Sequence, residues 1–196
     1  MERDDFESLI LKATVEAEVK RMSMNKTKAE VNEESNWSEL EATFKAMLYH
    51  QFLEHSVDYS IISMENSPNA KDNKEIKSKK VDIWIEDKKF TYLLEVKMID
   101  IRRRSGTLRR VYNKGGLFQD LLKLNKILEY FDNRNYFGIA IAVYNGHDNA
   151  LDCDHIKNKL DNNIKEQLNR HLKMVICANG SCEYVMDGLI KRCGVK

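Results

Sequence analysis

The chain has 196 residues, of which 42% are hydrophobic and 32% are charged, and its formal net charge is +1. Such a composition is typical of a globular protein, and the length fits one domain with a small appendage. The small net charge excludes the bulk basicity of a histone-like protein, so a polyanionic partner would need a local basic patch.

Three negative observations bear on the compartment. No apolar run approaches the roughly 18 residues of a transmembrane helix, and the first residues lack a secretory signal. The four cysteines form no CxxC pair, which argues against a zinc site. We therefore expect a cytoplasmic protein with free thiols and no membrane association.

Hydrophobic spacing predicts alternating helices and strands along the chain. A helix is expected over residues 4–22, then a polar linker, and then a second helix from Ser38 to His55, with Ser38 as N-cap and Glu41 completing a capping box. The later elements are strands at 57–64, 80–86 and 89–98, a helix at 117–133, a strand at 136–144, a helix at 154–172, and short strands at 173–178 and 182–188. This order predicts an α/β fold with a mixed central sheet and helices on both faces.

The hairpin KKVDIWIEDKKFTYLLEVKMID, residues 79–100, carries unusual charges. Because successive side chains of a strand point to opposite faces, Glu95 and Lys97 share one face of the second strand. Asp82 lies on the same surface when the apolar faces of the two strands coincide, with Val81, Ile83 and Ile85 forming the apolar face of the first strand.

The turn of this hairpin sets the neighbours of Asp82. A turn centred on Asp87 and Lys88 places Asp82 opposite Leu93 and makes Glu95 its diagonal neighbour, about 7–8 Å away. A slip of one residue would turn the apolar side chains of the first strand to the polar face, so the hydrophobic pattern disfavours it.

Two carboxylates and an ammonium group on one surface suit metal-assisted phosphate chemistry. Carboxylate oxygens of Asp82 and Glu95 are ligands that Mg²⁺ prefers, and the backbone carbonyl of Val96 is a further possible ligand. A lysine at position 97 can orient or deprotonate the attacking water. The alternative is a solvated face with cross-strand ion pairs of small energy.

The chain resembles the PD-(D/E)xK nuclease superfamily, whose fold is the restriction-endonuclease-like α-β-β-β-α-β core. In that resemblance VDIWI supplies Asp82, and LEVK supplies Glu95 and Lys97, while Val81 stands in place of the proline. The likeness spans roughly residues 37–145, and the nuclease-like domain would comprise residues 37–196 after an N-terminal helix and linker at 1–36.

The resemblance implies two further site residues. Glu41 on the first core helix would complete the metal site, with Glu39 as the alternative acid and a purely capping role as the alternative interpretation. Gln119 in LFQDLLKL matches the glutamine of a Q-x-x-x-L pattern, although Lys123 occupies the fifth position. Gln119 would hold a metal-bound water or a phosphate, or would simply be an exposed glutamine.

A basic loop follows the Glu95 strand. Its cations would neutralise phosphates of a nucleic acid in a salt-dependent manner, or would belong to a solvated charged loop. These candidate nucleic-acid-binding residues are Arg102, Arg103, Arg104, Arg109, Arg110 and Lys114. Trp84, beside Asp82, is interpreted as a packing residue.

The resemblance implies a Mg²⁺-dependent endonuclease, with Mn²⁺ able to substitute, that hydrolyses phosphodiester bonds in DNA. Asp82, Glu95 and Glu41 would bind the metal and Lys97 would activate water. A nuclease for RNA or single strands, and a binding module without catalysis, are the alternatives. A homodimer would suit an enzyme that cuts two strands.

Overall fold

The computed structural model describes residues 3–28, 37–55, 61–100, 116–131, 135–145, 171–178, 181–184 and 192–194. Its helices are α1 (Arg3–Lys28), α2 (Trp37–His55), α3 (Lys74–Lys77) and α5 (Leu117–Phe131). Its strands are β1 (Ile61–Asn66), β2 (Val81–Glu86), β3 (Thr91–Asp100), β4 (Tyr136–Asn145), β5 (Leu172–Ala178), β6 (Ser181–Tyr184) and β7 (Arg192–Gly194).

The strands form one mixed sheet in the order β1-β2-β3-β4-β5-β6-β7. The pairs β1–β2 and β2–β3 are antiparallel, β3, β4 and β5 run parallel, and β5, β6 and β7 are again antiparallel. The long parallel strands β3 and β4 lie in the middle of this sheet. The described side chains of β4 are apolar on both faces, as expected for a strand covered by helices, whereas one face of β3 also carries Glu95 and Lys97. The expected α/β class, with a mixed central sheet and helices on both faces, is therefore confirmed.

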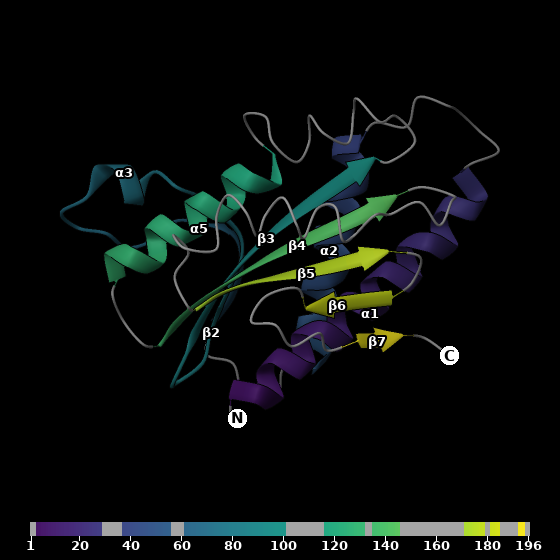
Figure 1. Cartoon of the computed structure of the whole chain (residues 1–196), viewed down its shortest axis with the longest axis horizontal. Helices are drawn as coiled ribbons and strands as arrows, with labels where there is room; N and C mark the ends of the chain where they lie inside the picture. The colour runs from purple at the N-terminus through teal and green to yellow at the C-terminus, as the bar shows by residue number, and fades with distance from the viewer. Residues whose placement is uncertain are drawn as a thin grey trace.

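One face of the sheet is covered by α1 and α2 (Figure 1). Phe44, Leu48 and Phe52 recur at four-residue intervals on α2, so they form one stripe, and all three are fully buried. From α1, the ring of Phe6 stacks on Tyr92 of β3 with 3.7 Å between ring centroids. Burial of a side chain of this size contributes about 1.5–3 kcal/mol, so these contacts fix both helices on the sheet.

The opposite face is covered by α5 (Figure 1). Leu121, Leu124 and Leu128 of α5 pack in one buried cluster with Trp84 of β2 and Leu93 of β3. Trp84 is thus a packing residue, as expected. The face of the hairpin that carries the charged residues lies beneath this helix, which contradicts the alternative of a solvated polar face.

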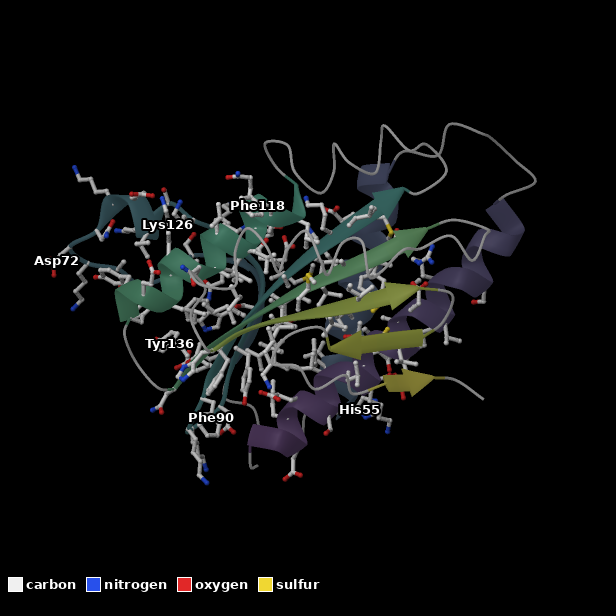
Figure 2. All side chains as sticks on the ribbon, in the orientation of Figure 1. His55, Asp72, Phe90, Phe118, Lys126 and Tyr136 are labelled. Atoms are coloured by element: carbon white, nitrogen blue, oxygen red, sulfur yellow. The ribbon has the colours of Figure 1, made fainter. Side chains whose placement is uncertain are left out.

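Aromatic side chains gather at one end of the sheet (Figure 2). Phe90 and Tyr136 lie toward the same end of it, where Thr91 of β3 pairs with Tyr136 of β4. At this end Tyr136 also stacks on Phe131, the last residue of α5, at 4.4 Å between centroids. These aromatic contacts anchor the C-terminal end of α5 to the sheet.

Two expected helix boundaries and the expected packing of one strand residue are wrong. α2 begins at Trp37, so Ser38 lies in its first turn rather than at its N-cap. α1 continues to Lys28, six residues past the expected end, because its weakly patterned final turns lack a strong stop signal. Val81 packs in the cluster beneath α5 rather than with Ile83 and Ile85.

Other elements were not expected at all or fall elsewhere. The short helix α3 interrupts the polar loop before β2, with Asn73 as its N-cap, and β7 extends the sheet at its far edge. Leu172 starts β5 instead of ending a helix, and the remainder of that expected helix lies almost wholly outside the described residues. Among the helices in the described ranges, none combines the length and hydropathy that a membrane span requires.

Candidate functional site

The candidate site lies where β2 and β3 separate. Their pairing runs from Glu86 opposite Thr91 to Ile83 opposite Leu94. The connecting loop spans residues 87–90 and is closed by a hydrogen bond from the Asp87 N–H to the Phe90 carbonyl.

The expected two-residue turn at Asp87 and Lys88 is therefore wrong. The observed register is shifted by two residues, and continuing it by one step sets Asp82 against Glu95 rather than against Leu93. An even shift keeps Ile83, Trp84 and Ile85 on their expected faces, because the side-chain period of a strand is two, whereas Val81 at the start of β2 packs beneath α5. Asp82 and Glu95 consequently come closer than the expected register would have placed them.

Beyond Ile83 and Leu94, the last backbone pair of β2 and β3, the side chain of Asp82 connects the two strands. Its Oδ2 accepts a hydrogen bond from the backbone N–H of Val96 at 2.8 Å. Its other oxygen, Oδ1, accepts one from the ammonium group of Lys45 on α2, also at 2.8 Å. Both oxygens of this largely buried carboxylate are thus held by charge-assisted hydrogen bonds, which are stronger than neutral ones.

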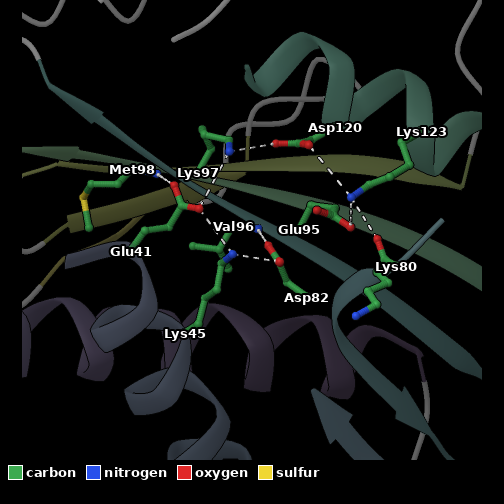
Figure 3. Close-up of polar contacts among 10 residues, drawn as sticks. All are labelled: Glu41, Lys45, Lys80, Asp82, Glu95, Val96, Lys97, Met98, Asp120 and Lys123. Carbon is green, nitrogen blue, oxygen red and sulfur yellow. Dashed lines mark hydrogen bonds and ion pairs between the residues drawn. The ribbon is translucent and has the colours of Figure 1, made fainter. Parts of the chain in front are cut away.

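Glu41, like Asp82, contacts both a backbone N–H of β3 and the ammonium group of Lys45, and its N–H partner lies two residues further along β3. Its Oε2 accepts a hydrogen bond from the backbone N–H of Met98 at 3.1 Å. Its Oε1 lies 3.2 Å from the ammonium of Lys45 and 3.7 Å from that of Lys97. Glu41 therefore reaches across to β3 (Figure 3), and a purely capping role does not account for its position.

α5 supplies the other side of the site. The Lys97 ammonium lies 3.6 Å from Asp120 Oδ2, and the Lys123 ammonium lies 2.6 Å from Glu95 Oε1 and 3.9 Å from Asp120 Oδ1. Lys123 also donates a hydrogen bond to the carbonyl of Lys80 at 3.0 Å. Glu95 Oε1 is buried, and its short contact with Lys123 is an ion pair without hydrogen-bond geometry.

These contacts form one chain of alternating charges from α2 through β3 to α5 (Figure 3). In order, its members are Asp82, Lys45, Glu41, Lys97, Asp120, Lys123 and Glu95. Its two ends are both carboxylates and come together at the gap between β2 and β3. The junction of Asp82 and Glu95 is therefore the place where this network lacks a positive charge.

The pKa of Glu95 reflects that deficit. Burial first, and then the neighbouring charge of Asp82, raise the pKa of Glu95 from 4.5 to about 8, against the opposing effect of Lys123. Burial also raises the pKa of Asp120. Burial lowers the pKa of Lys45, but Asp82 and Glu41 outweigh it, so that pKa is raised. Perturbed groups of this kind gather at functional sites, although structural ion-pair networks perturb pKa values too.

The donor atoms at the junction fit Mg²⁺. In the described part of the chain, no group of three or more carboxylate, imidazole or thiol side chains is arranged to enclose a metal ion. Mg²⁺ keeps several waters and needs only one or two carboxylates, which Asp82 and Glu95 provide. The N–H and C=O of one strand residue point to the same side, so the Val96 carbonyl faces the gap as its N–H does.

Two other expectations have different outcomes. Gln119 lies on the exposed surface of α5, and no contact joins its side chain to this network among the described residues. The basic residues Arg102, Arg103, Arg104, Arg109, Arg110 and Lys114 lie outside the described residues.

Three members of the network were not expected from the sequence: Lys45, Asp120 and Lys123. A signal was present, because Glu41 and Lys45 are four residues apart and Asp120 and Lys123 three apart, which are spacings of neighbours on a helix surface. That pattern occurs on many exposed helices, so spacing alone does not distinguish it from a solvated ion pair.

Comparison of the chain with models of protein families, with curated proteins and with solved structures finds no match in any of the three.

Proposed function

We propose that this protein is a Mg²⁺-dependent endonuclease of the PD-(D/E)xK type that hydrolyses phosphodiester bonds in DNA. The observation that carries the proposal is the meeting of two buried carboxylates, Asp82 and Glu95, beside the ammonium-bearing network of Lys97. Two like charges in a buried site are unfavourable, so burial and Asp82 keep Glu95 protonated up to about pH 8, and a divalent cation between the two carboxylates would allow both to ionise.

The order of elements also supports the proposal. In the described residues from α2 to β4, the order is α2, β1, β2, β3, α5 and β4, which is the α-β-β-β-α-β order of the restriction-endonuclease-like fold apart from the small insertion α3. The acidic residue lies at the start of the second of these strands and the E-x-K on the third. A glutamate from the first helix, Glu41, reaches the same place.

Each residue would have a separate role. Asp82 and Glu95 would bind Mg²⁺ together with the Val96 carbonyl. Glu41, which also holds β3 through the Met98 N–H, would assist in binding the metal. When bound, Mg²⁺ would neutralise phosphate charge and make a bound water more acidic. Lys97 would orient the attacking water, since its ammonium lies between Glu41 and Asp120 at 3.7 and 3.6 Å.

One observation favours a different function. Each of the four carboxylates of the network already contacts a lysine, so the charges are largely balanced within the protein. A nucleic-acid-binding or protein-binding module that uses the network only for structure would show the same contacts. A nuclease that uses the same site to cleave RNA or single-stranded nucleic acid is a further alternative.

Cleavage assays separate these functions. The full chain is incubated with Mg²⁺ or Mn²⁺ and with supercoiled, linear, branched and single-stranded DNA and with RNA. We expect metal-dependent cleavage of DNA, and we expect Lys97→Ala to abolish it. Binding without cleavage under any metal would identify the module, and cleavage confined to RNA or single strands would identify that alternative.

A matched control is available on α5. Lys126 makes an ion pair with Glu75 at 3.2 Å, and both side chains are more than half exposed. Lys126→Ala removes a lysine and an ion pair without touching the network. It should therefore cleave like the wild type, and a loss equal to that of Lys97→Ala would show that the assay reports stability rather than chemistry.

A further inference from the structure

Lys45 holds the oxygens that a metal ion would need. Its ammonium lies 2.8 Å from Asp82 Oδ1 and 3.2 Å from Glu41 Oε1 (Figure 3). The second oxygen of each carboxylate accepts a backbone N–H, from Val96 and from Met98 respectively. The ammonium thus contacts the oxygen of Asp82 that is not tied to β3.

An ammonium and a divalent cation exclude each other at one carboxylate oxygen, because they repel and both need the same lone pairs. The ammonium group of Lys45 can move away from the two carboxylates, since a flexible four-carbon chain joins it to the backbone. The other two lysines are placed differently. Lys97 contacts Glu41 and Asp120, and Lys123 is tethered by the carbonyl of Lys80.

We propose that Lys45 is a built-in counter-ion that occupies Asp82 and Glu41 in the metal-free protein and lowers the affinity of the site for Mg²⁺. This inference rests on the proposed function and adds a positioning residue that sets how much metal the site requires. Lys45 must release Asp82 Oδ1 before that oxygen can serve a metal ion. A lysine with a purely structural role would instead support metal binding by holding both carboxylates in place.

The first experiment compares variants of the full chain without nucleic acid. Lys45→Met removes the charge and keeps most of the side-chain volume, Lys45→Arg keeps the charge, and Lys126→Met is the matched control on a surface ion pair. Binding of Mg²⁺ and Mn²⁺ is measured by calorimetry and by the rise in Tm. We expect Lys45→Met to reach half-saturation at a metal concentration at least tenfold lower than the wild type, and the other two variants to resemble the wild type.

The second experiment uses only the wild-type protein, so it does not depend on the folding of a variant. Lysines are labelled with an amine-acetylating reagent, and labelling at each position is read by mass spectrometry. At saturating Mg²⁺ we expect labelling of Lys45 to rise at least threefold, because its ammonium has left the carboxylates, while labelling of Lys126 stays constant.

The outcomes separate this inference from the proposed function. If the wild type binds Mg²⁺ but Lys45→Met binds it equally or more weakly, or if Mg²⁺ leaves the labelling of Lys45 unchanged, the inference is overturned and the nuclease proposal stands. If neither protein binds either metal, with or without DNA, both are overturned.

Discussion

The carboxylate of Asp82 accepts a hydrogen bond from the backbone N–H of Val96 at 2.8 Å, so a side chain continues the contact between β2 and β3 where their pairing ends. Asp82 is for this reason a structural residue as well as a candidate metal ligand. Its substitution should affect stability and cleavage separately.

Asp82→Ala should destabilise the metal-free protein by about 2–4 kcal/mol, because it leaves a buried N–H and the Lys45 ammonium without this partner. Asp82→Asn keeps an oxygen for the Val96 N–H and should cost less. Both should lose cleavage, because alanine offers no ligand and the neutral amide of asparagine is a poor ligand for Mg²⁺. Urea unfolding and the cleavage assay measure the two effects, and equal stability of the alanine variant and the wild type would contradict the role in β3.

The stability of the metal-free protein should fall as pH rises from about 4.5 to about 8. Over this range Glu95 keeps its proton in the folded state, where its pKa is raised to about 8, but loses it in the unfolded state. At about 1.4 kcal/mol per pKa unit, the loss is roughly 5 kcal/mol. Glu95→Gln has no such proton and should lack this component.

Unfolding in urea with EDTA, at several pH values between 4.5 and 8.5, checks this expectation. The difference between wild type and Glu95→Gln removes the contribution of groups that titrate alike in both proteins. Stability curves that stay parallel across this range would show that Glu95 ionises freely in the folded protein.

Gly138 of β4 lies beneath α5 and should not tolerate a side chain. A Cβ there would lie 3.0 Å from Leu172 Cδ1, 3.2 Å from Leu128 Cδ1 and 3.4 Å from Leu124 Cβ. All three leucines are buried and closely packed, so their shifts would strain the core. Gly138→Ala should destabilise the protein by about 1–3 kcal/mol, measured by urea unfolding, and unchanged stability would mean that α5 can move away from the sheet.

Arg21 and Glu18 form a buried bidentate pair on α1, with bonds of 2.6 and 2.7 Å. Arg21→Met removes one partner of a buried pair and should cost about 3–5 kcal/mol. Adding Glu18→Gln should recover part of the loss, because no buried charge of this pair then remains.

Lys20→Met provides the control for this pair. Lys20 lies on the same helix, 4.0 Å from Glu54, and both side chains are about half exposed. Its loss should change the free energy of unfolding by less than about 0.5 kcal/mol, since exposed pairs contribute little. Similar effects of Arg21→Met and Lys20→Met would show that α1 contributes little to the core.

The sequence was sufficient to bring Asp82, Glu95 and Lys97 to one place. Strand alternation assigns Glu95 and Lys97 to one face of β3, and an error of two residues in the hairpin turn leaves that assignment unchanged. The stripe of Phe44, Leu48 and Phe52 similarly identified the buried face of α2 and set Glu41 at its edge. The α/β class followed from the same two hydrophobic periods, which are two residues in a strand and 3.6 residues in a helix.

What the pattern could not reveal depends on how the helices dock. Lys45, Asp120 and Lys123 enter the network because α2 and α5 approach the gap between β2 and β3 from opposite faces of the sheet. Helical periodicity assigns a residue to a face of its own helix, whereas the contacts of that face depend on packing between segments far apart in the chain. The burial that raises the pKa of Glu95 arises from the same docking, so a charge that alternation places correctly acquires its chemistry only in the folded protein.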